Sequence, residues 1–340
     1  NNKHALELGS KYAPEMACLP LKINIGNYIQ AYEMGADTIL MAGGCGPCRF
    51  GYYSQIHREI LKEAGYDMEV ITLETTNGDV RTLFESIKQV TGVKGLVKVP
   101  NVVRHGVIIA KKVDELEDLT FKLRPREKVK GSVDKVYRQF REKALETKGV
   151  KGMRALLKDT FKKLEAIELD PDTKPLKVGI VGEIYTGIEQ FASFEIQEKL
   201  GGMGVEIDRK VTLSNWIIEH ILKKGFHLPR DMSYARAAEP WLGKMIGGHA
   251  QETIGHTVIY ARNNYDGVIQ IFPFSCMPEI VAESILPSVE KELGIPVLTL
   301  IIDEMTADTG YMTRVEAFID LLERRREGGK YKGEWLLSWN

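Results

Sequence analysis

Hydrophobic patterns typical of β-strands and α-helices alternate along two stretches of this chain. In the first stretch, short apolar runs at 37–43 and 68–73 predict strands, and segments with apolar residues at helical spacing flank them. In the second stretch, further predicted strands alternate with helical segments, at 176–182, 205–211, 266–273 and 296–303. Parallel strands need a long crossover, usually a helix, so this order predicts parallel sheets with helices on both faces.

A strongly basic segment separates the two stretches. From Lys122 to Glu165 there are 15 Lys and Arg residues against 6 Asp and Glu residues, together with two helical stripes of apolar residues. We therefore expect an α/β fold with two doubly wound, flavodoxin- or Rossmann-like parallel-sheet domains and a helical bridge. The expected ranges are 1–110 for the first domain, 111–175 for the bridge and linker, and 176–340 for the second domain. The basic helices present either a solvated face or a docking surface for an acidic partner.

Composition and charge exclude several classes of protein. The formal net charge of -1 argues against a nucleic-acid or membrane binder that uses its whole surface. The sequence has no run of 18 uninterrupted apolar residues, and its first residues lack the apolar segment of a signal peptide. Four cysteines in 340 residues are too few for a secreted disulfide scaffold. We therefore expect a cytoplasmic protein with reduced thiols.

The four cysteines all lie next to predicted helix starts. Cys45 and Cys48 occupy the glycine-rich turn between the strand at 37–43 and the next helix, and Cys276 lies in the turn after the strand at 266–273. Cys18 immediately precedes a helix whose first turn contains Pro20. A helix N-terminus favours thiolate, and open α/β sheets bind ligands at the carboxyl ends of their strands.

These positions are compatible with four interpretations of the cysteines. A lone cysteine is often a small core residue, and a C-x-x-C pair after a strand is also typical of a thioredoxin-like redox motif. Four thiols can instead close one zinc site or ligate one iron–sulfur cluster. In the cluster interpretation, Gly44 and Gly46 let the backbone approach closely, and Lys22 and Arg49 balance the negative charge. Glu183, which follows the strand at 176–182, is expected to face the cleft between the domains in a structural role.

Two motifs around these cysteines resemble those of a known family. The first is E-x-x-C-x-P-x-K, at residues 15–22, and the second is P-F-x-C-x-P-E, at residues 273–279. The segment G-G-C-G-P-C at 43–48 lies between them. In this order they resemble the 2-hydroxyacyl-CoA dehydratase family, in particular its branch of CoA-substrate-specific enzyme activase-related proteins. The resemblance covers nearly the whole chain except the basic bridge.

The resemblance implies stacked flavodoxin-like domains with a [4Fe-4S]-type cluster between them. Carried over by position, the cluster ligands are the four cysteines, namely Cys18, Cys45, Cys48 and Cys276. Family members pass low-potential electrons to difficult reductions or dehydrations under anaerobic conditions, and receive them from a separate ATP-hydrolysing iron–sulfur activator protein. If all four thiolates bind, no iron is left open, which favours electron transfer over catalysis at the cluster.

The chain is therefore expected to be a redox component rather than a self-contained enzyme. It has no G-x-x-x-x-G-K-[ST] phosphate loop, so we do not expect it to hydrolyse ATP itself. The expected partners are the activator, a dehydratase or reductase subunit and a second copy of the chain, with neither nucleic acid nor a membrane. One alternative is a reductase or dehydratase that acts on a small, CoA-linked substrate at its own cluster. The others are a zinc-containing or metal-free assembly module, and a larger cluster shared across a dimer.

Overall fold

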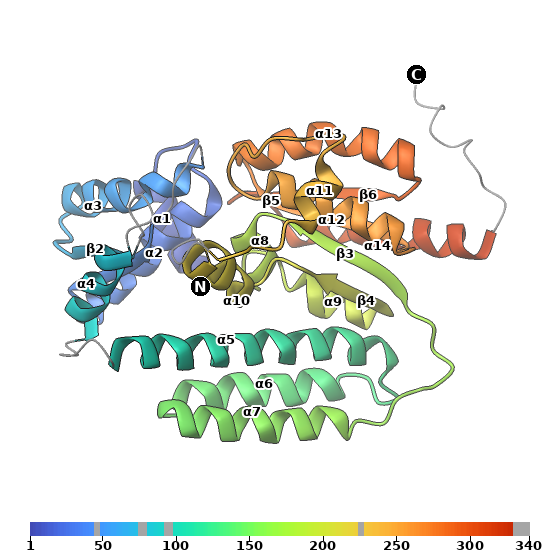
Figure 1. Cartoon of the computed structure of the whole chain (residues 1–340), viewed down its shortest axis with the longest axis horizontal. Coiled ribbons are helices and arrows are strands. Elements are labelled where there is room, and N and C mark those ends of the chain that lie inside the picture. The colour runs from blue at the N-terminus through green and yellow to red at the C-terminus, as the bar shows by residue number, and fades with distance from the viewer. Residues whose placement is uncertain (44–47, 74–79, 92–97, 224–227, 329–340) are drawn as a thin grey trace.

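The computed structural model describes residues 1–43, 48–73, 80–91, 98–223 and 228–328. These residues form a mixed α/β structure with two parallel sheets and a group of long helices (Figure 1). The α/β class predicted from the alternating pattern is therefore confirmed. The expected domain boundaries stay a prediction, and helix α5 (Lys98–Leu123) runs across residue 110. Among the described helices, none combines the length and the apolar character needed to cross a bilayer.

The first sheet pairs β1 (Thr38–Ala42) with β2 (Glu69–Leu73) in parallel. The helices of this part of the chain are α1 (Lys3–Tyr12), α2 (Leu19–Glu33), the 3₁₀ turn η1 (Arg49–Tyr52), α3 (Tyr53–Glu63) and α4 (Val80–Thr91). The core between the sheet and these helices contains Ile25 and Ile29 of α2, Ile39 of β1, and Tyr53 and Leu61 of α3. Burial of these apolar side chains is what holds so small a sheet in place.

The second sheet has four parallel strands in the order β4–β3–β5–β6. The strands are β3 (Leu176–Gly182), β4 (Val205–Arg209), β5 (Gly267–Pro273) and β6 (Val297–Ile302). The helices are α8 (Ile184–Ile188), α9 (Ile196–Gly202), α10 (Leu213–Trp216), the π-helical segment η4 (Ile217–Lys223), α11 (Ser233–Ala238), α12 (Ala250–Arg262), α13 (Met277–Leu293) and α14 (Asp308–Gly328). In chain order this sheet reads 2-1-3-4, as in flavodoxin-like folds. A topological switch point therefore lies between the carboxyl ends of β3 and β5.

Both faces of the second sheet are covered by helices, as the doubly wound pattern requires. On one face, Ile180 of β3 packs in a core with Ile196 of α9. On the other face, Val181 packs with Tyr260 of α12. Tyr260 can approach this closely because Gly179 has no side chain, and a Cβ atom at Gly179 would lie 2.3 Å from the tyrosine ring.

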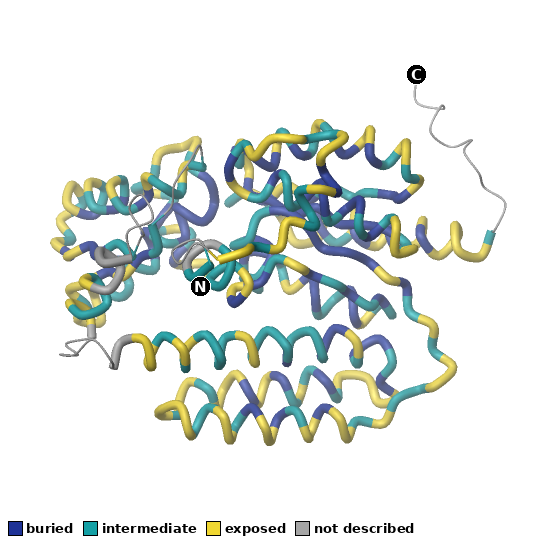
Figure 2. Tube along the Cα trace, in the orientation of Figure 1, coloured by how far each residue is buried: buried dark blue, intermediate teal, exposed yellow. Residues whose placement is uncertain are grey.

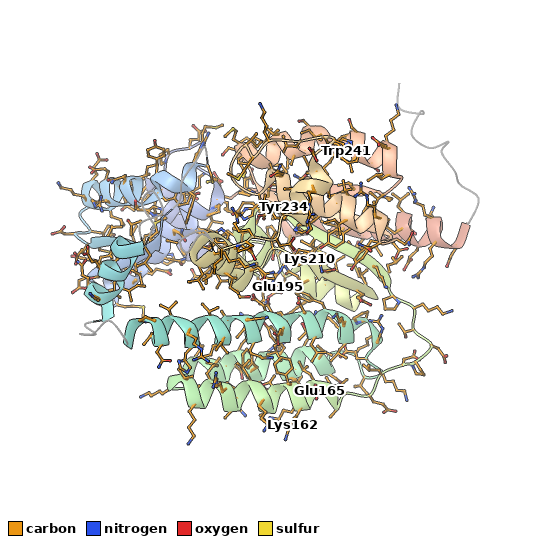
Figure 3. The ribbon with its side chains drawn as sticks, viewed as in Figure 1. Lys162, Glu165, Glu195, Lys210, Tyr234 and Trp241 are labelled. Carbon is orange, nitrogen blue, oxygen red and sulfur yellow. The ribbon has the colours of Figure 1, made fainter. Side chains whose placement is uncertain are left out.

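Helices α5, α6 (Ser132–Glu146) and α7 (Gly149–Glu165) form the predicted helical bridge, with the short turn η3 (Arg124–Arg126) after α5. They enclose a core of their own, made of Leu116, Val133, Tyr137, Phe140, Leu157 and Leu164. The outer faces of α6 and α7 are largely exposed (Figure 2). Lys162 and Glu165, labelled in Figure 3, lie on α7 and are both exposed.

Helix α2 is buried on two sides because it lies between the two sheets. Its residues Leu19 and Ile23 belong to the core of the second sheet. Its residues Leu21, Ile25 and Ile29 belong to the core of the first sheet. The helix therefore joins the two α/β parts through apolar contacts, and its first turn carries the cysteine at position 18.

Helices α1 and α2 cross at two glycines, which makes this contact sensitive to side-chain size. A Cβ atom at Gly26 would lie 1.7 Å from the carbonyl oxygen of Ala5, and one at Gly9 would lie 1.6 Å from that of Lys22. We expect Gly26→Ala to lower the free energy of unfolding by about 2 to 3 kcal/mol, because the two backbones must move apart. Urea denaturation followed by circular dichroism measures this loss.

The matched control for this substitution is Gly106→Ala in α5. Nothing lies within 4 Å of a Cβ atom at Gly106, and the residue is exposed. Alanine stabilises a helix interior by about 1 kcal/mol relative to glycine, so this variant is expected to gain stability. Equal effects of the two substitutions would show that the helix crossing is not tight.

Two helices after β4 are short. Helix α10 begins at Leu213, and Thr212 is its capping residue, with its hydroxyl accepting from the Asn215 N–H at 3.4 Å. Helix α11 is limited to Ser233–Ala238. Pro240 follows closely, and a proline ring obstructs helix continuation because it has no N–H and clashes with the preceding turn.

Candidate functional site

Three of the four cysteines are N-cap residues in the structure. Cys18 caps α2, Cys48 caps the 3₁₀ turn η1, and Cys276 caps α13, each with an extended backbone. Prolines in the first turns of α2 and α13 suit these helix starts, because proline needs no intrahelical hydrogen-bond partner there. The prediction that cysteines precede helices is confirmed for these three. Cys45, Gly44 and Gly46 lie outside the described residues.

The site lies at the switch point of the second sheet. Gly182 ends β3 with a φ of +122°, and a Cβ atom there would lie 2.0 Å from the Ile271 carbonyl oxygen, so only glycine fits. Glu183 follows directly and caps α8. In the turn after the neighbouring strand β5, Ser275 has a φ of +65°, which is a strained conformation for a residue with a side chain. This turn directs the chain into Cys276.

One backbone carbonyl ties the cysteine-bearing segments together. The carbonyl oxygen of Met16 accepts a hydrogen bond from the Arg49 guanidinium at 2.9 Å and from the Ser275 hydroxyl at 3.1 Å. Met16 lies two residues before Cys18, Arg49 follows Cys48, and Ser275 precedes Cys276. Segments from three distant parts of the sequence therefore meet at one point.

Three thiols and one carboxyl group lie near one another, with Cys18 buried and Cys48, Cys276 and Glu183 half-buried. Removal from water raises the pKa of the thiols of Cys18, Cys48 and Cys276 above the usual value. Negative charge on Glu183 raises the pKa of all three thiols further, and Cys48 does the same to Cys18 and Cys276. Glu183 and Cys48 therefore disfavour ionisation of the neighbouring thiols.

Backbone N–H groups lie near each of these sulfur atoms, although none of the three side chains makes a capping hydrogen bond. The backbone N–H groups of Leu21, Phe50 and Glu279 lower the thiol pKa values of Cys18, Cys48 and Cys276 respectively, against the effect of burial. The Glu183 carboxylate likewise accepts from the Tyr185 and Thr186 N–H groups, at 2.9 and 3.0 Å. The helix N-termini therefore offer donors to negative charge at this site.

A second buried carboxyl group supports the start of α13. Glu279 is fully buried, and its oxygens accept hydrogen bonds from the Thr253 hydroxyl and the Gln270 amide, at about 3.0 to 3.1 Å. Burial raises the pKa of Glu279 to about 7, against the effect of these hydrogen bonds. This residue holds the first turn of α13 against α12 and β5, and so positions the Cys276 segment.

Lys22 was expected to balance negative charge beside the cysteines, but its ammonium group pairs with Glu304. Its side chain is buried, and its ammonium group donates to the Glu304 carboxylate at 2.5 Å and to the Glu15 carbonyl oxygen at 3.1 Å. A cavity of about 150 Å³ lies at this ion pair, lined by Glu15, Met16, Ala17, Leu19, Lys22, Phe274, Asp303 and Glu304. Most of its lining comes from the segments that carry Cys18 and Cys276, and Asp303 and Glu304 follow β6. Both basic residues predicted for the site donate to backbone carbonyls of the loop before Cys18, Lys22 to Glu15 and Arg49 to Met16.

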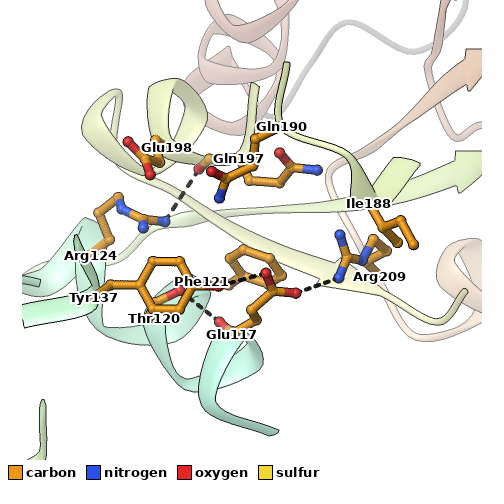
Figure 4. A pocket seen from close by; sticks show the side chains of 10 residues that line it. All are labelled: Glu117, Thr120, Phe121, Arg124, Tyr137, Ile188, Gln190, Gln197, Glu198 and Arg209. Atoms are coloured by element: carbon orange, nitrogen blue, oxygen red, sulfur yellow. Dashed lines mark hydrogen bonds and ion pairs between the residues drawn. The ribbon is translucent and has the colours of Figure 1, made fainter. Parts of the chain in front are cut away.

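A second, smaller cavity lies between the helical bridge and the second sheet (Figure 4). It has room for about one water molecule, with a volume of about 10 Å³. Arg209 of β4 crosses it and donates to the Glu117 carboxylate at 2.7 Å and to the Gly187 carbonyl oxygen at 2.9 Å. Tyr137 donates to the same carboxylate at 2.7 Å. These contacts attach the bridge to the sheet and lie apart from the cysteines.

Sequence reasoning missed two features of the cysteine site. Tyr53 hydrogen-bonds through its hydroxyl to the Cys18 sulfur, and no role was predicted for it from the sequence. Glu183 acts electrostatically on all three described thiols, although it was predicted only to face a cleft. The position of Glu183 after a predicted strand was the available signal, whereas nothing in the spacing of Tyr53 indicates its contact.

Within the described part of the chain, no group of three or more His, Cys, Asp or Glu side chains is arranged to hold a single metal ion. This finding does not include Cys45, which is outside that part of the chain. Comparison with known proteins gives no match: no family model matches the chain, and no curated protein matches it.

Proposed function

We propose that this chain binds an iron–sulfur cluster through Cys18, Cys48 and Cys276, with Cys45 as the fourth ligand. The observation that carries the proposal is the convergence of three cysteine-capped helix starts, with Glu183, at the switch point of the second sheet. Parallel α/β sheets bind their ligands at such points. The motifs around the cysteines, which resemble those of the 2-hydroxyacyl-CoA dehydratase family, support the same conclusion.

The chemistry of the donor set fits a cationic metal group. Removal from water raises the pKa values of the three thiols and of Glu183, and the Glu183 charge raises those of the thiols further, so a nearby positive charge would favour their ionised forms. Bound metal reverses this effect and deprotonates a coordinating thiol outright. In a cluster each thiolate binds a different iron, so the sulfur atoms are farther apart than around a single ion. The backbone N–H groups at the three helix starts then stabilise the ligand sulfurs.

In this proposal the chain transfers electrons at low potential within a dehydratase-like or reductase-like system. A cluster supplies one-electron transfer, and four protein thiolates leave no iron open for a substrate. The described residues contribute a largely enclosed site and backbone N–H groups near the sulfurs. They also contribute the Met16 carbonyl oxygen, which accepts hydrogen bonds from Arg49 and Ser275 and so connects the three cysteine-bearing segments. The expected electron donor is a separate ATP-hydrolysing iron–sulfur protein, and the acceptor is a reductase or dehydratase subunit.

The proposal is tested by purifying the chain without oxygen and measuring its iron, acid-labile sulfide, zinc and visible absorption. About four irons and four sulfides per chain, with broad visible absorption lost on reduction, are the expected result. A colourless protein with about one zinc per chain would contradict the cluster and favour a structural metal module. A metal-free, fully folded chain would contradict both.

A second function is favoured by the cavity at Lys22. The cavity is close to the segments that bear Cys18 and Cys276, and it offers both charged side chains and the apolar Phe274 and Leu19. A small substrate held there would make the chain a reductase or dehydratase acting at its own cluster. A change in the EPR spectrum of the reduced protein on addition of a small acyl-CoA thioester would favour this function. An unchanged spectrum would favour electron transfer alone.

A further inference from the structure

We infer that the Tyr53 hydroxyl donates a hydrogen bond to the Cys18 sulfur and thereby sets the reduction potential of the group which that sulfur ligates. This inference rests on the proposed function, because it requires a metal cluster at the cysteines. Tyr53 acts as a positioning residue, since it touches the ligand sulfur rather than a substrate. Nothing in the sequence motifs assigns it a role.

The contact itself is the first support for this inference. Tyr53 is the first residue of α3, and its hydroxyl is hydrogen-bonded to the sulfur of Cys18 across 35 positions of the sequence. Both residues are largely buried, with exposed fractions of 3% for Tyr53 and 9% for Cys18. Water therefore competes little for the hydroxyl. Of the three described cysteines, Cys18 is the one whose sulfur meets a side-chain hydroxyl in addition to a backbone amide.

The direction of the hydrogen bond follows from the chemistry of the two groups. A cysteine sulfur bound to iron has lost its proton and can only accept, so the tyrosine must donate. A phenol hydroxyl has an ordinary pKa of about 10, so it keeps its proton and can donate near neutral pH.

Two aromatic contacts hold the ring so that its hydroxyl stays at the sulfur. The Tyr53 ring packs edge-on against Phe50 and His57, with centroid separations of 5.4 and 5.3 Å. His57 is itself fully buried and packs against Tyr28 at 5.2 Å. Burial lowers the pKa of His57 to about 4, so its ring is neutral near pH 7 and adds no charge beside the site. Packing therefore fixes the ring of Tyr53, and its hydroxyl is hydrogen-bonded to the Cys18 sulfur.

A hydrogen bond to a ligand sulfur changes the reduction potential because reduction adds negative charge to the cluster and its thiolates. The positive end of the O–H dipole stabilises the reduced form more than the oxidised form. Its loss should therefore make the potential more negative. A hydrogen bond to a charged group contributes about 1.5 to 3 kcal/mol in all, and only part of that differs between the two redox states.

The test is the reduction potential of the anaerobically purified Tyr53→Phe variant, measured by redox titration followed by EPR. Phenylalanine keeps the ring and its packing and removes only the hydroxyl. We expect the variant to keep its full iron and sulfide content. We expect the equilibrium constant for reduction of the cluster to fall by up to about tenfold, which for one electron is a shift of up to about 59 mV to more negative potential. The matched control is Tyr28→Phe, which removes a hydroxyl from the same aromatic group on the other side of His57 and should leave the potential unchanged.

The outcomes separate this inference from the proposed function. A wild-type chain without iron and sulfide overturns both. A wild-type cluster with an unshifted potential in Tyr53→Phe overturns the role of Tyr53 and leaves the cluster proposal standing. Equal shifts in Tyr53→Phe and Tyr28→Phe also overturn it, because they point to general repacking. If Tyr53→Phe loses iron, a Tyr53→Trp variant, which retains an N–H donor, decides the question: restored iron supports the donor role, and continued loss contradicts it.

Discussion

Replacing Cys276 with serine is expected to remove most of the iron, sulfide and visible absorbance from the anaerobically purified protein. In the proposed site Cys276 is the ligand that follows a strand of the second sheet, and a hydroxyl at that position would be a much weaker iron ligand than a thiolate. Changes to groups that only support a metal ligand already reduce metal affinity by about 10- to 100-fold, so removal of a ligand should cost more. Iron and sulfide analysis and the absorption spectrum measure the loss.

The control for this substitution is Met277→Leu at the next residue. Met277 is 42% exposed and begins the same helix, so the change tests whether any disturbance of this turn is enough. Met277→Leu should retain its iron, and both variants should keep the far-ultraviolet circular dichroism of the wild type. A Cys276→Ser protein with full iron content and an unchanged potential would contradict the assignment of Cys276 as a ligand.

Replacing Arg209 with methionine is expected to lower the free energy of unfolding by about 3 to 5 kcal/mol. The Arg209 guanidinium is buried, donates to Glu117 and Gly187, and lies over the Phe121 ring at 5.6 Å. Methionine fills much of the volume but leaves the Glu117 carboxylate in a largely buried place without its cation. Because Glu117 belongs to α5, the loss should be accompanied by faster amide exchange in the helical bridge.

An exposed ion pair provides the comparison for Arg209. Arg324 pairs with Asp320 at 2.8 Å, but their side chains are 76% and 56% exposed. Exposed pairs contribute little, so Arg324→Met should cost less than about 0.5 kcal/mol. The double variant Arg209→Met/Glu117→Gln should recover part of the loss, since it also removes the unpaired charge. Equal losses in Arg209→Met and Arg324→Met would show that the buried pair does not hold the bridge.

The elements that depend on local pattern could be predicted from the sequence. Strands such as β3 and β5 are short buried runs bounded by glycine or proline, and their position agrees with the pattern to within a residue or so. The N-cap positions of Cys18 and Cys276 follow from the prolines two residues later. Helix α2 shows why the packing between elements is harder to predict. A helix buried on one side has a single stripe of apolar residues, which identifies the face that packs on the core. Helix α2 is buried on two sides, so its sequence pattern does not indicate which residues face which core.

The side-chain partners in the site depend on tertiary contacts that no local pattern encodes. The contact of Tyr53 with Cys18 depends on how α3 packs on α2, and the same is true of Phe50 and His57 around the ring. Lys22 was predicted from its closeness in sequence to a cysteine, yet its position on the helix directs it toward Glu304. The sequence therefore indicated that three of the cysteines precede helices, but not which side chains contact them.

The hydrogen bond between Ser275 and the Met16 carbonyl joins residues 259 positions apart in the chain. During synthesis the segment around Cys18 leaves the ribosome long before the strand that precedes Cys276. Bringing such distant segments together carries the entropy cost of closing a very long loop, so this contact belongs to the last stage of folding. If the site binds a cluster as proposed, its cysteine segments come together only on a nearly finished chain, and loading of the site is expected to follow translation rather than accompany it.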